Sequence, residues 1–179
     1  MPVPMFLCHA NCCRSVMARY LYENQFPQAH ALSAGFEAGY AINGRAAAML
    51  HAWGIDCGGH QPRQLRRPLC DHADAIFVME PEEVPRLLAE YGYDLAGKTY
   101  LFADPFSQPR SFRQGEYRVE DPSFDRRPVA ELVREFAWFR TRVDEIHEVM
   151  VGRGKAVVPA ARYLDRLAEL EEATRRAAA

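Results

Sequence analysis

Short apolar runs alternate with segments of helical periodicity along the first hundred residues. Four runs have the length and turn-rich borders of buried strands, namely 3–7, 31–34, 74–79 and 99–103. Between them, apolar residues recur at helical spacing over 15–26, 44–53 and 81–91. Strands that alternate with helices predict an α/β fold, in which helices cover both faces of a parallel sheet.

The second half of the chain carries longer elements. Residues 103–127 are rich in Pro, Ser, Gly, Arg and Asp and predict a long loop, which in a compact domain is usually functional. An apolar stripe from Val129 to Met150 predicts one long helix, and a second stripe predicts a final helix over 158–176. We therefore expect a domain over 1–152 and a helical extension over 153–179.

Composition narrows the class of protein. A chain of 179 residues suits a single domain, and a formal charge of −2 gives no indication of nucleic-acid binding. No apolar run approaches the roughly 20 residues that span a bilayer, and the start of the chain lacks a secretory pattern. We expect a cytoplasmic protein without membrane or nucleic-acid partners, present as a monomer or weak homodimer. Its five cysteines suggest catalytic, redox or buried thiols rather than disulfides.

The chemically informative segment is residues 8–15, Cys-His-Ala-Asn-Cys-Cys-Arg-Ser, which follows the first strand and precedes the first helix. Loop amides at a helix N-terminus bind an anion, and a guanidinium there grips two phosphate oxygens. The same positive field predicts that the pKa of Cys8 lies well below the free value of about 8.5, which would make it a thiolate nucleophile.

Two other interpretations of these residues are weaker. A zinc site built from Cys8, His9, Cys12 and Cys13 would need a tetrahedral set, but adjacent cysteines at a helix start splay apart and no second pair completes the site. A nucleotide-binding phosphate loop would need a Gly-Lys-Ser/Thr sequence, which is absent here. We expect neither a metal nor a cofactor.

Residues 6–18, Phe-Leu-Cys-His-Ala-Asn-Cys-Cys-Arg-Ser-Val-Met-Ala, resemble the loop of the low-molecular-weight protein tyrosine phosphatases. The similarity covers roughly residues 3–150 and continues in order at four further segments, 33–35, 54–60, 73–80 and 121–122. The resemblance implies a four-stranded parallel sheet flanked by helices, to which this chain adds a C-terminal helix. It also implies hydrolysis of a phosphate monoester through a cysteinyl-phosphate, with protein phosphotyrosine as the favoured substrate and a small phosphomonoester as the other one.

The resemblance also implies roles for individual residues. Cys8 would be the nucleophile, Arg14 would bind the phosphate, and Ser15 would donate to the Cys8 thiolate when it leaves. The other phosphate-binding and supporting residues would be His9, Ala10, Asn11, Cys12, Cys13, Ser33 and His60. Among these, Asn11 would hold the strained loop with the help of Ser33 and His60, and Cys13 would form a reversible disulfide with the nucleophile.

Ester cleavage further requires an acid that protonates the departing oxygen. Two Asp-Pro pairs occur in the long loop, at Asp104 and at Asp121, and either pair can simply begin a turn. The family places its acid shortly before the last long helix, which favours Asp121.

Several positions depart from the family pattern. Ala10 replaces the usual loop glycine, and Ser123-Phe124 replaces an aromatic pair after Asp-Pro. His9 stands where an apolar residue is common, and it either contacts substrate or lies exposed at the rim. The candidates for the substrate cleft are Phe36, Tyr40, Ser123 and Phe124, of which Phe36 and Tyr40 equally suit ordinary core or rim positions.

Two rival functions remain. The short segment 33–45 and Phe139-Arg140 are closer to the related arsenate reductases. The thioredoxin-coupled type needs two more cysteines after the third strand, and residues 79–84 have none, so only a small-thiol-coupled reductase survives. A catalytically inactive phosphate-binding relative is the other rival, which the retained nucleophile and acid disfavour.

Overall fold

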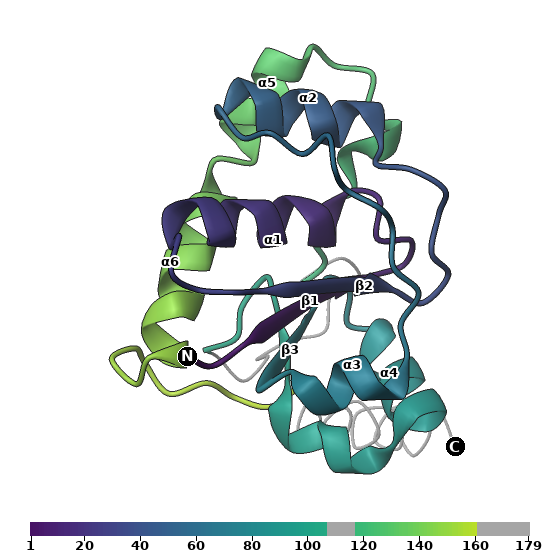
Figure 1. The fold of residues 1–179 in the computed structure, drawn as a ribbon, viewed down its shortest axis with the longest axis vertical. Helices are drawn as coiled ribbons and strands as arrows, with labels where there is room; N and C mark the ends of the chain where they lie inside the picture. Colours follow the sequence, from purple (N-terminus) through teal and green to yellow (C-terminus); the bar gives the residue numbers. More distant parts are fainter. Residues whose placement is uncertain (107–116, 161–179) are drawn as a thin grey trace, which may run out of the picture.

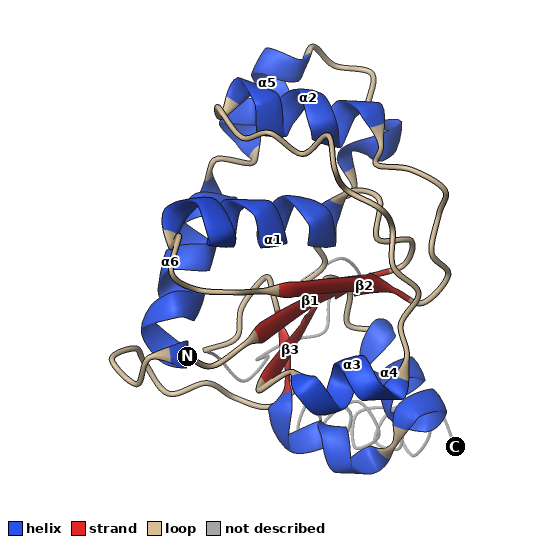
Figure 2. Ribbon diagram, in the orientation of Figure 1, coloured by secondary structure: helices blue, strands red, loops and turns tan. Residues whose placement is uncertain are grey.

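The computed structural model describes residues 1–106 and 117–160. At its centre lies a four-stranded parallel sheet with the order β2-β1-β3-β4 (Figures 1 and 2). The strands are β1 (Pro4–Cys8), β2 (Leu32–Gly35), β3 (Ala75–Val78) and β4 (Thr99–Leu101). The central strand β1 pairs Met5 with Leu32 on one side and with Ile76 on the other. The predicted four-stranded α/β fold is confirmed.

Alternate residues of the central strands point to opposite faces of the sheet, so each face has its own core. Phe6 and Phe77 face α1 (Arg14–Gln25), α2 (Gly44–Ala52), α5 (Val129–Glu135) and α6 (Trp138–Met150). Leu7 and Val78 face α3 (Arg67–His72), α4 (Glu83–Tyr91) and the 3-10 helix η1 (Tyr93–Lys98). Figure 1 shows α1, α2 and α5 above the sheet, α6 to its left, and α3 and α4 below it.

The prediction of a single long helix over 129–150 is wrong, because the chain forms two helices with a break at Phe136 and Ala137. At the break, N–H groups bond three residues back, as from Phe139 to the carbonyl of Phe136. Both phenylalanines are nevertheless buried in the same core. The apolar stripe therefore runs unchanged across the break, which is why periodicity predicted one helix.

The end of the described chain lies against β4. The N–H of Ala160 donates to the carbonyl of Thr99 at 2.7 Å, and the N–H of Val158 donates to the carbonyl of Pro105 at 2.9 Å. Most of the predicted final helix, residues 161–179, falls outside the described residues, as do residues 107–116 of the predicted loop. The proposed boundary between the domain and its extension at residue 152 stays a prediction. Within the described residues, no helix is long and apolar enough to cross a membrane.

Gly35, at the end of β2, touches the main chain of the loop that follows β1. A Cβ added there would lie 2.6 Å from the carbonyl carbon of Ala10 and from the nitrogen of Asn11. Because those atoms belong to backbone, Gly35→Ala should lower the free energy of unfolding by about 1–3 kcal/mol. Urea unfolding measures this change.

The matched control is Gly97→Ala, where the added Cβ would meet no atom within 4 Å. Equal unfolding midpoints for the two variants would show that the close contact between Gly35 and the loop backbone does not affect stability.

Candidate active site

The loop from Cys8 to Ser15 joins the carboxyl end of β1 to the start of α1. Its carbonyls at His9, Ala10 and Cys12 accept hydrogen bonds of 2.8–2.9 Å from the N–H groups of Glu37, Gly39 and Asn43, which lie in the connection between β2 and α2. In a trans peptide the N–H points opposite to its C=O. Carbonyls bonded outward therefore leave the loop N–H groups on the inner side, where an anion can accept from them.

Asn11 holds the shape of this loop. Its φ of 51° lies in the left-handed region, which is uncommon for residues other than glycine. The side chain donates to Ser15 Oγ at 3.0 Å and accepts from the N–H of Arg63 at 2.8 Å. The main-chain oxygen accepts from His60 Nε2 at 2.9 Å. Ser33 is buried on β2, but none of the described hydrogen bonds joins its hydroxyl to this loop.

Cys8 is almost fully buried, and its sulfur lies 3.0 Å from Ser15 Oγ. Burial raises the pKa of the Cys8 thiol, while Arg14 and the hydrogen bond with Ser15 oppose that rise. The expectation of a lowered pKa is therefore wrong for this resting arrangement. The physical reason is the loss of hydration around the buried sulfur.

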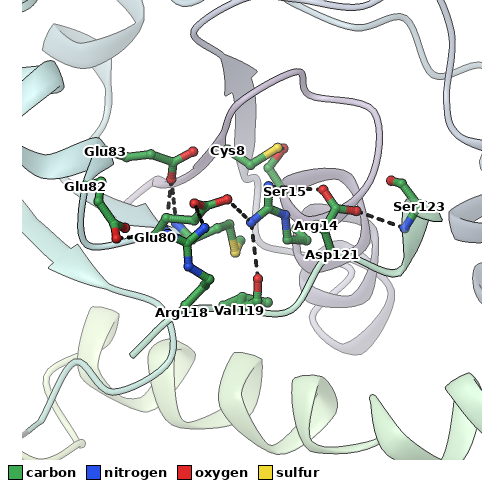
Figure 3. A network of polar contacts seen from close by, with 11 residues as sticks. Cys8, Arg14, Ser15, Glu80, Glu82, Glu83, Arg118, Val119, Asp121 and Ser123 are labelled. Carbon is green, nitrogen blue, oxygen red and sulfur yellow. Dashed lines mark hydrogen bonds and ion pairs between the residues drawn. The ribbon is translucent and has the colours of Figure 1, made fainter. Parts of the chain in front are cut away.

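Arg14 is buried and lies among carboxylates (Figure 3). Its Nη1 donates to Glu80 Oε1 at 2.5 Å and to the carbonyl of Val119 at 3.2 Å, and its Nη2 lies 3.1 Å from Asp121 Oδ2. Burial alone would lower the pKa of Arg14, but the negative charges of Asp121 and Glu80 outweigh it and raise the pKa. The guanidinium therefore remains charged.

These side chains meet in a cleft of about 480 Å³. It is lined by Cys8, His9, Ala10, Cys12, Cys13, Arg14, Asn43, Glu80, Asp121, Ser123 and Phe124. Asp121 Oδ1 accepts from the N–H of Ser123 at 2.9 Å, which fixes the carboxylate at the start of the 3-10 helix η2 (Pro122–Phe124). Asp104 does not line this cleft, and its carboxylate accepts from the N–H of Phe106 at 3.0 Å.

Two residues expected at the substrate cleft do not line it. Phe36 is buried in the core between the sheet and α4, with the Arg86 guanidinium 4.7 Å from its ring centre. Tyr40 is fully exposed and lies outside the cleft lining. Both assignments to the cleft are therefore corrected. His9 does line the cleft mouth, where its half-exposed ring lies 3.7 Å from the Glu37 carboxylate.

The remaining cysteines are also free thiols. Cys13 is buried close to Cys8, and burial raises the pKa of its thiol above the ordinary range. Cys57 and Cys70 are buried away from the cleft lining. Across residues 1–106 and 117–160, no three His, Cys, Asp or Glu side chains are arranged to hold a metal ion.

Three acidic or polar side chains near Arg14 were missed by sequence reasoning: Asn43, Glu80 and Glu83. Asn43 caps the N-terminus of α2 by accepting from the N–H of Arg45 at 2.9 Å. The position of Glu80 just after β3, next to β1 in a parallel sheet, is the signal that could have indicated it. Glu83 has no such signal, since it lies inside α4.

Glu83 is buried directly below the site. Its Oε2 accepts from the N–H groups of Met79 at 3.0 Å and Glu80 at 3.1 Å, whereas its Oε1 has no hydrogen-bond partner among the described residues. Burial raises the pKa of the Glu83 carboxyl to about 8. The carboxyl is therefore largely protonated at neutral pH, and it fixes the turn that presents Glu80 to Arg14.

Comparison with known proteins finds relatives that are named as low-molecular-weight tyrosine phosphatases. The family model described as low molecular weight phosphotyrosine protein phosphatase matches residues 4–151. A low-molecular-weight protein-tyrosine-phosphatase, Ptp, of Acinetobacter johnsonii is 28% identical over 123 residues, which cover 66% of this chain and 78% of that protein.

Solved structures share the fold at lower identity. The YwlE arginine phosphatase from Geobacillus stearothermophilus has a TM-score of 0.69 and 24% identity, with 84% of this chain and 93% of that one covered. A low-molecular-weight phosphotyrosine phosphatase from Vibrio cholerae O395 has a TM-score of 0.71 and 19% identity, with 86% and 99% covered.

The raised pKa of Glu83 predicts a pH-dependent stability. The folded pKa of about 8 lies above the ordinary 4.5, so the contribution of Glu83 is fully present below pH 4.5 and is lost as the pH rises through 8. Glu83→Gln keeps an acceptor for the two N–H groups but does not ionise. Relative to the parent, its free energy of unfolding should therefore rise by a few kcal/mol between pH 5 and pH 8, at about 1.4 kcal/mol per pKa unit.

Urea unfolding of both proteins at the two pH values measures this difference. Glu82→Gln is the control, because the neighbouring Glu82 side chain is exposed. A Glu83→Gln variant with the same pH dependence as the parent would contradict the buried, protonated carboxyl.

Proposed function

Because the chain belongs to the low-molecular-weight phosphotyrosine protein phosphatase family, we propose that it hydrolyses phosphotyrosine on proteins through a cysteinyl-phosphate intermediate. The observation that carries this proposal is the convergence of Cys8, Arg14 and Asp121 on one cleft. These residues supply a nucleophile, a cation for the phosphate and an acid for the leaving group. Each of the three groups comes from a different part of the fold: the end of β1, the start of α1 and the start of η2.

In the first step, the phosphate oxygens accept from the loop N–H groups and from Arg14, and the Cys8 thiolate attacks phosphorus. The P–O bond to the tyrosine breaks, and Asp121 gives its proton to the phenolic oxygen. In the second step, the Asp121 carboxylate takes a proton from a water molecule that attacks phosphorus. The S–P bond breaks, and the departing Cys8 thiolate is stabilised by Ser15, whose hydroxyl lies 3.0 Å from it.

The reactive form of the site carries its proton on Asp121 rather than on Cys8. In the resting arrangement burial favours the Cys8 thiol, and Asp121 is paired with Arg14. A proton on Asp121 removes one of the two carboxylate charges that Arg14 faces. The positive charge of Arg14 then acts more strongly on the Cys8 sulfur and on the arriving phosphate.

The cleft walls bear on the substrate class. Phe124 lines the cleft and is highly exposed, so its ring is available to stack against an aryl phosphate. Ser123 forms the neighbouring part of the wall in place of a second aromatic ring. This supports an aryl ester held against one aromatic wall. The fold is shared with an arginine phosphatase. A test of the substrate class should therefore compare a phosphoarginine peptide with a phosphotyrosine peptide.

A small-thiol-coupled arsenate reductase is the second candidate, because arsenate resembles phosphate and would fit the same loop. It would need no cysteine beyond Cys8, since the external thiol completes the reduction. Both candidates use the same nucleophile, but they differ in the oxyanion that Cys8 attacks and in the group that completes the reaction, which is water for the phosphatase and an external thiol for the reductase.

We predict that the parent protein hydrolyses p-nitrophenyl phosphate in the presence of a chelator and that Cys8→Ser abolishes turnover, because the hydroxyl is a far weaker nucleophile than a thiolate. Release of p-nitrophenol measures the rate. Full activity in Cys8→Ser would contradict the cysteinyl-phosphate. In parallel, arsenate consumption is followed with glutathione or mycothiol, and efficient reduction beside negligible ester hydrolysis would identify the reductase.

A second prediction separates the two Asp-Pro pairs. Asp121→Asn should lower kcat/KM for phenyl phosphate by about 10²–10⁴-fold, because it removes the proton donor. Asp104→Asn is the matched control and should leave kcat/KM near that of the parent, since Asp104 lies outside the cleft lining. If Asp104→Asn alone slows the reaction, the acid is assigned to the wrong residue.

A further inference from the structure

The Glu80 carboxylate bridges two guanidinium groups (Figure 3). Its Oε1 accepts from Arg14 at 2.5 Å, and its Oε2 accepts from Nη1 of Arg118. The second guanidinium also donates through Nη2 to Glu82 Oε1 at 2.8 Å. A continuous chain of ion pairs thus runs from the phosphate-binding arginine to Arg118, a half-exposed residue that does not line the cleft.

The main chain of Val119, next to Arg118, is hydrogen-bonded to the end of β3 and to Arg14. The N–H of Val119 donates to the carbonyl of Met79 at 2.9 Å, which prolongs the pairing at the end of β3. The carbonyl of Val119 accepts from Arg14 at 3.2 Å, and the Val119 side chain is buried. Asp121 follows only two residues later. The position of its carboxylate therefore depends on how residues 118 and 119 are held, as well as on its own bonds to Ser123 and Arg14.

We propose that Arg118 is a positioning residue for the general acid. By fastening its segment to Glu80 and Glu82, it fixes Asp121 at the distance from which a proton reaches the leaving oxygen. This inference rests on the proposed function, because it concerns the same ester cleavage. It assigns a role to a residue that touches neither phosphate nor leaving group.

A second consequence concerns the charge of Arg14. Glu80 forms ion pairs with both Arg14 and Arg118. The positive charge of Arg118 therefore weakens the negative potential that Glu80 exerts on Arg14. Loss of Arg118 would leave Glu80 paired with Arg14 alone. Val119 would remain bonded to Arg14 and Met79 through its main chain, so the phosphate site should keep its shape. The main expected defect is a looser placement of the segment that carries Asp121, and hence slower proton donation.

Loss of a well-placed acid has a recognisable kinetic pattern. An ester of a strongly acidic phenol, such as 2,4-dinitrophenyl phosphate, departs without a proton, whereas phenyl phosphate needs one. The parameter kcat/KM reports the first chemical step, in which this bond breaks. A displaced Asp121 therefore slows phenyl phosphate selectively, while a general loss of folded enzyme slows both esters by the same factor.

The experiment compares the parent with Arg118→Ala on these two esters. We expect kcat/KM for phenyl phosphate to fall by about 10–100-fold, which is the size of effect that a displacement near 1 Å produces. For 2,4-dinitrophenyl phosphate we expect a fall of less than about threefold. Asp121→Asn should show the same selectivity with a larger loss, and Glu82→Gln, which removes one partner of Arg118, should show it with a smaller loss.

Arg67→Ala is the matched control. Arg67 is likewise a half-exposed arginine held by two carboxylates, Asp71 and Asp94, but it lies on α3 and outside the cleft lining. Its variant should match the parent on both esters. Equal losses on the two esters in Arg118→Ala, or no loss at all, would overturn the positioning role.

Different results would contradict the proposed function and the role of Arg118. A parent protein that hydrolyses neither ester would contradict the proposed function itself, and with it the role of Arg118. An active parent whose Arg118→Ala variant is slowed without selectivity contradicts the role of Arg118 alone.

Discussion

The site depends on one buried positive charge. The Arg14 guanidinium is withdrawn from water at the start of α1, and a buried charge is tolerated only when partners compensate the lost hydration. Those partners are Glu80, Asp121 and the carbonyl of Val119, which come from the end of β3 and from the segment before η2. One requirement for charge compensation thus brings together pieces of chain that lie more than sixty residues apart.

The elements that could be predicted from the sequence are those whose signal is local. Each buried strand is a short apolar run, and the loop from Cys8 to Ser15 is a continuous stretch between a strand and a helix. The short helix α3 was missed because six residues carry too little periodicity. The break at Phe136 was missed because the buried residues on either side stay on one stripe, so the pattern contains no sign of the changed hydrogen bonding.

The site residues divide in the same way. Cys8, Arg14 and Asp121 could be found from motifs, but Glu80 and Arg118 meet only after folding, and no spacing rule connects them. Phe36 was misplaced because its side chain turns to the α4 face, which a sequence next to β2 does not reveal. The pKa of Cys8 was misjudged because the motif shows the cation and hides the burial that opposes it.

The charged groups around the resting site are linked by ion pairs. Arg14 and Arg118 face the carboxylates of Glu80, Glu82 and Asp121, while burial raises the pKa of Cys8 and of Glu83. A phosphate group that enters the loop adds negative charge and competes with the two carboxylates for Arg14. Glu80 is less exposed and is held by two guanidiniums, whereas Asp121 has a single ion pair and lies at the more open side of the cleft. We therefore propose that phosphate displaces Asp121 rather than Glu80 from Arg14, which would free Asp121 for its proposed role as the acid.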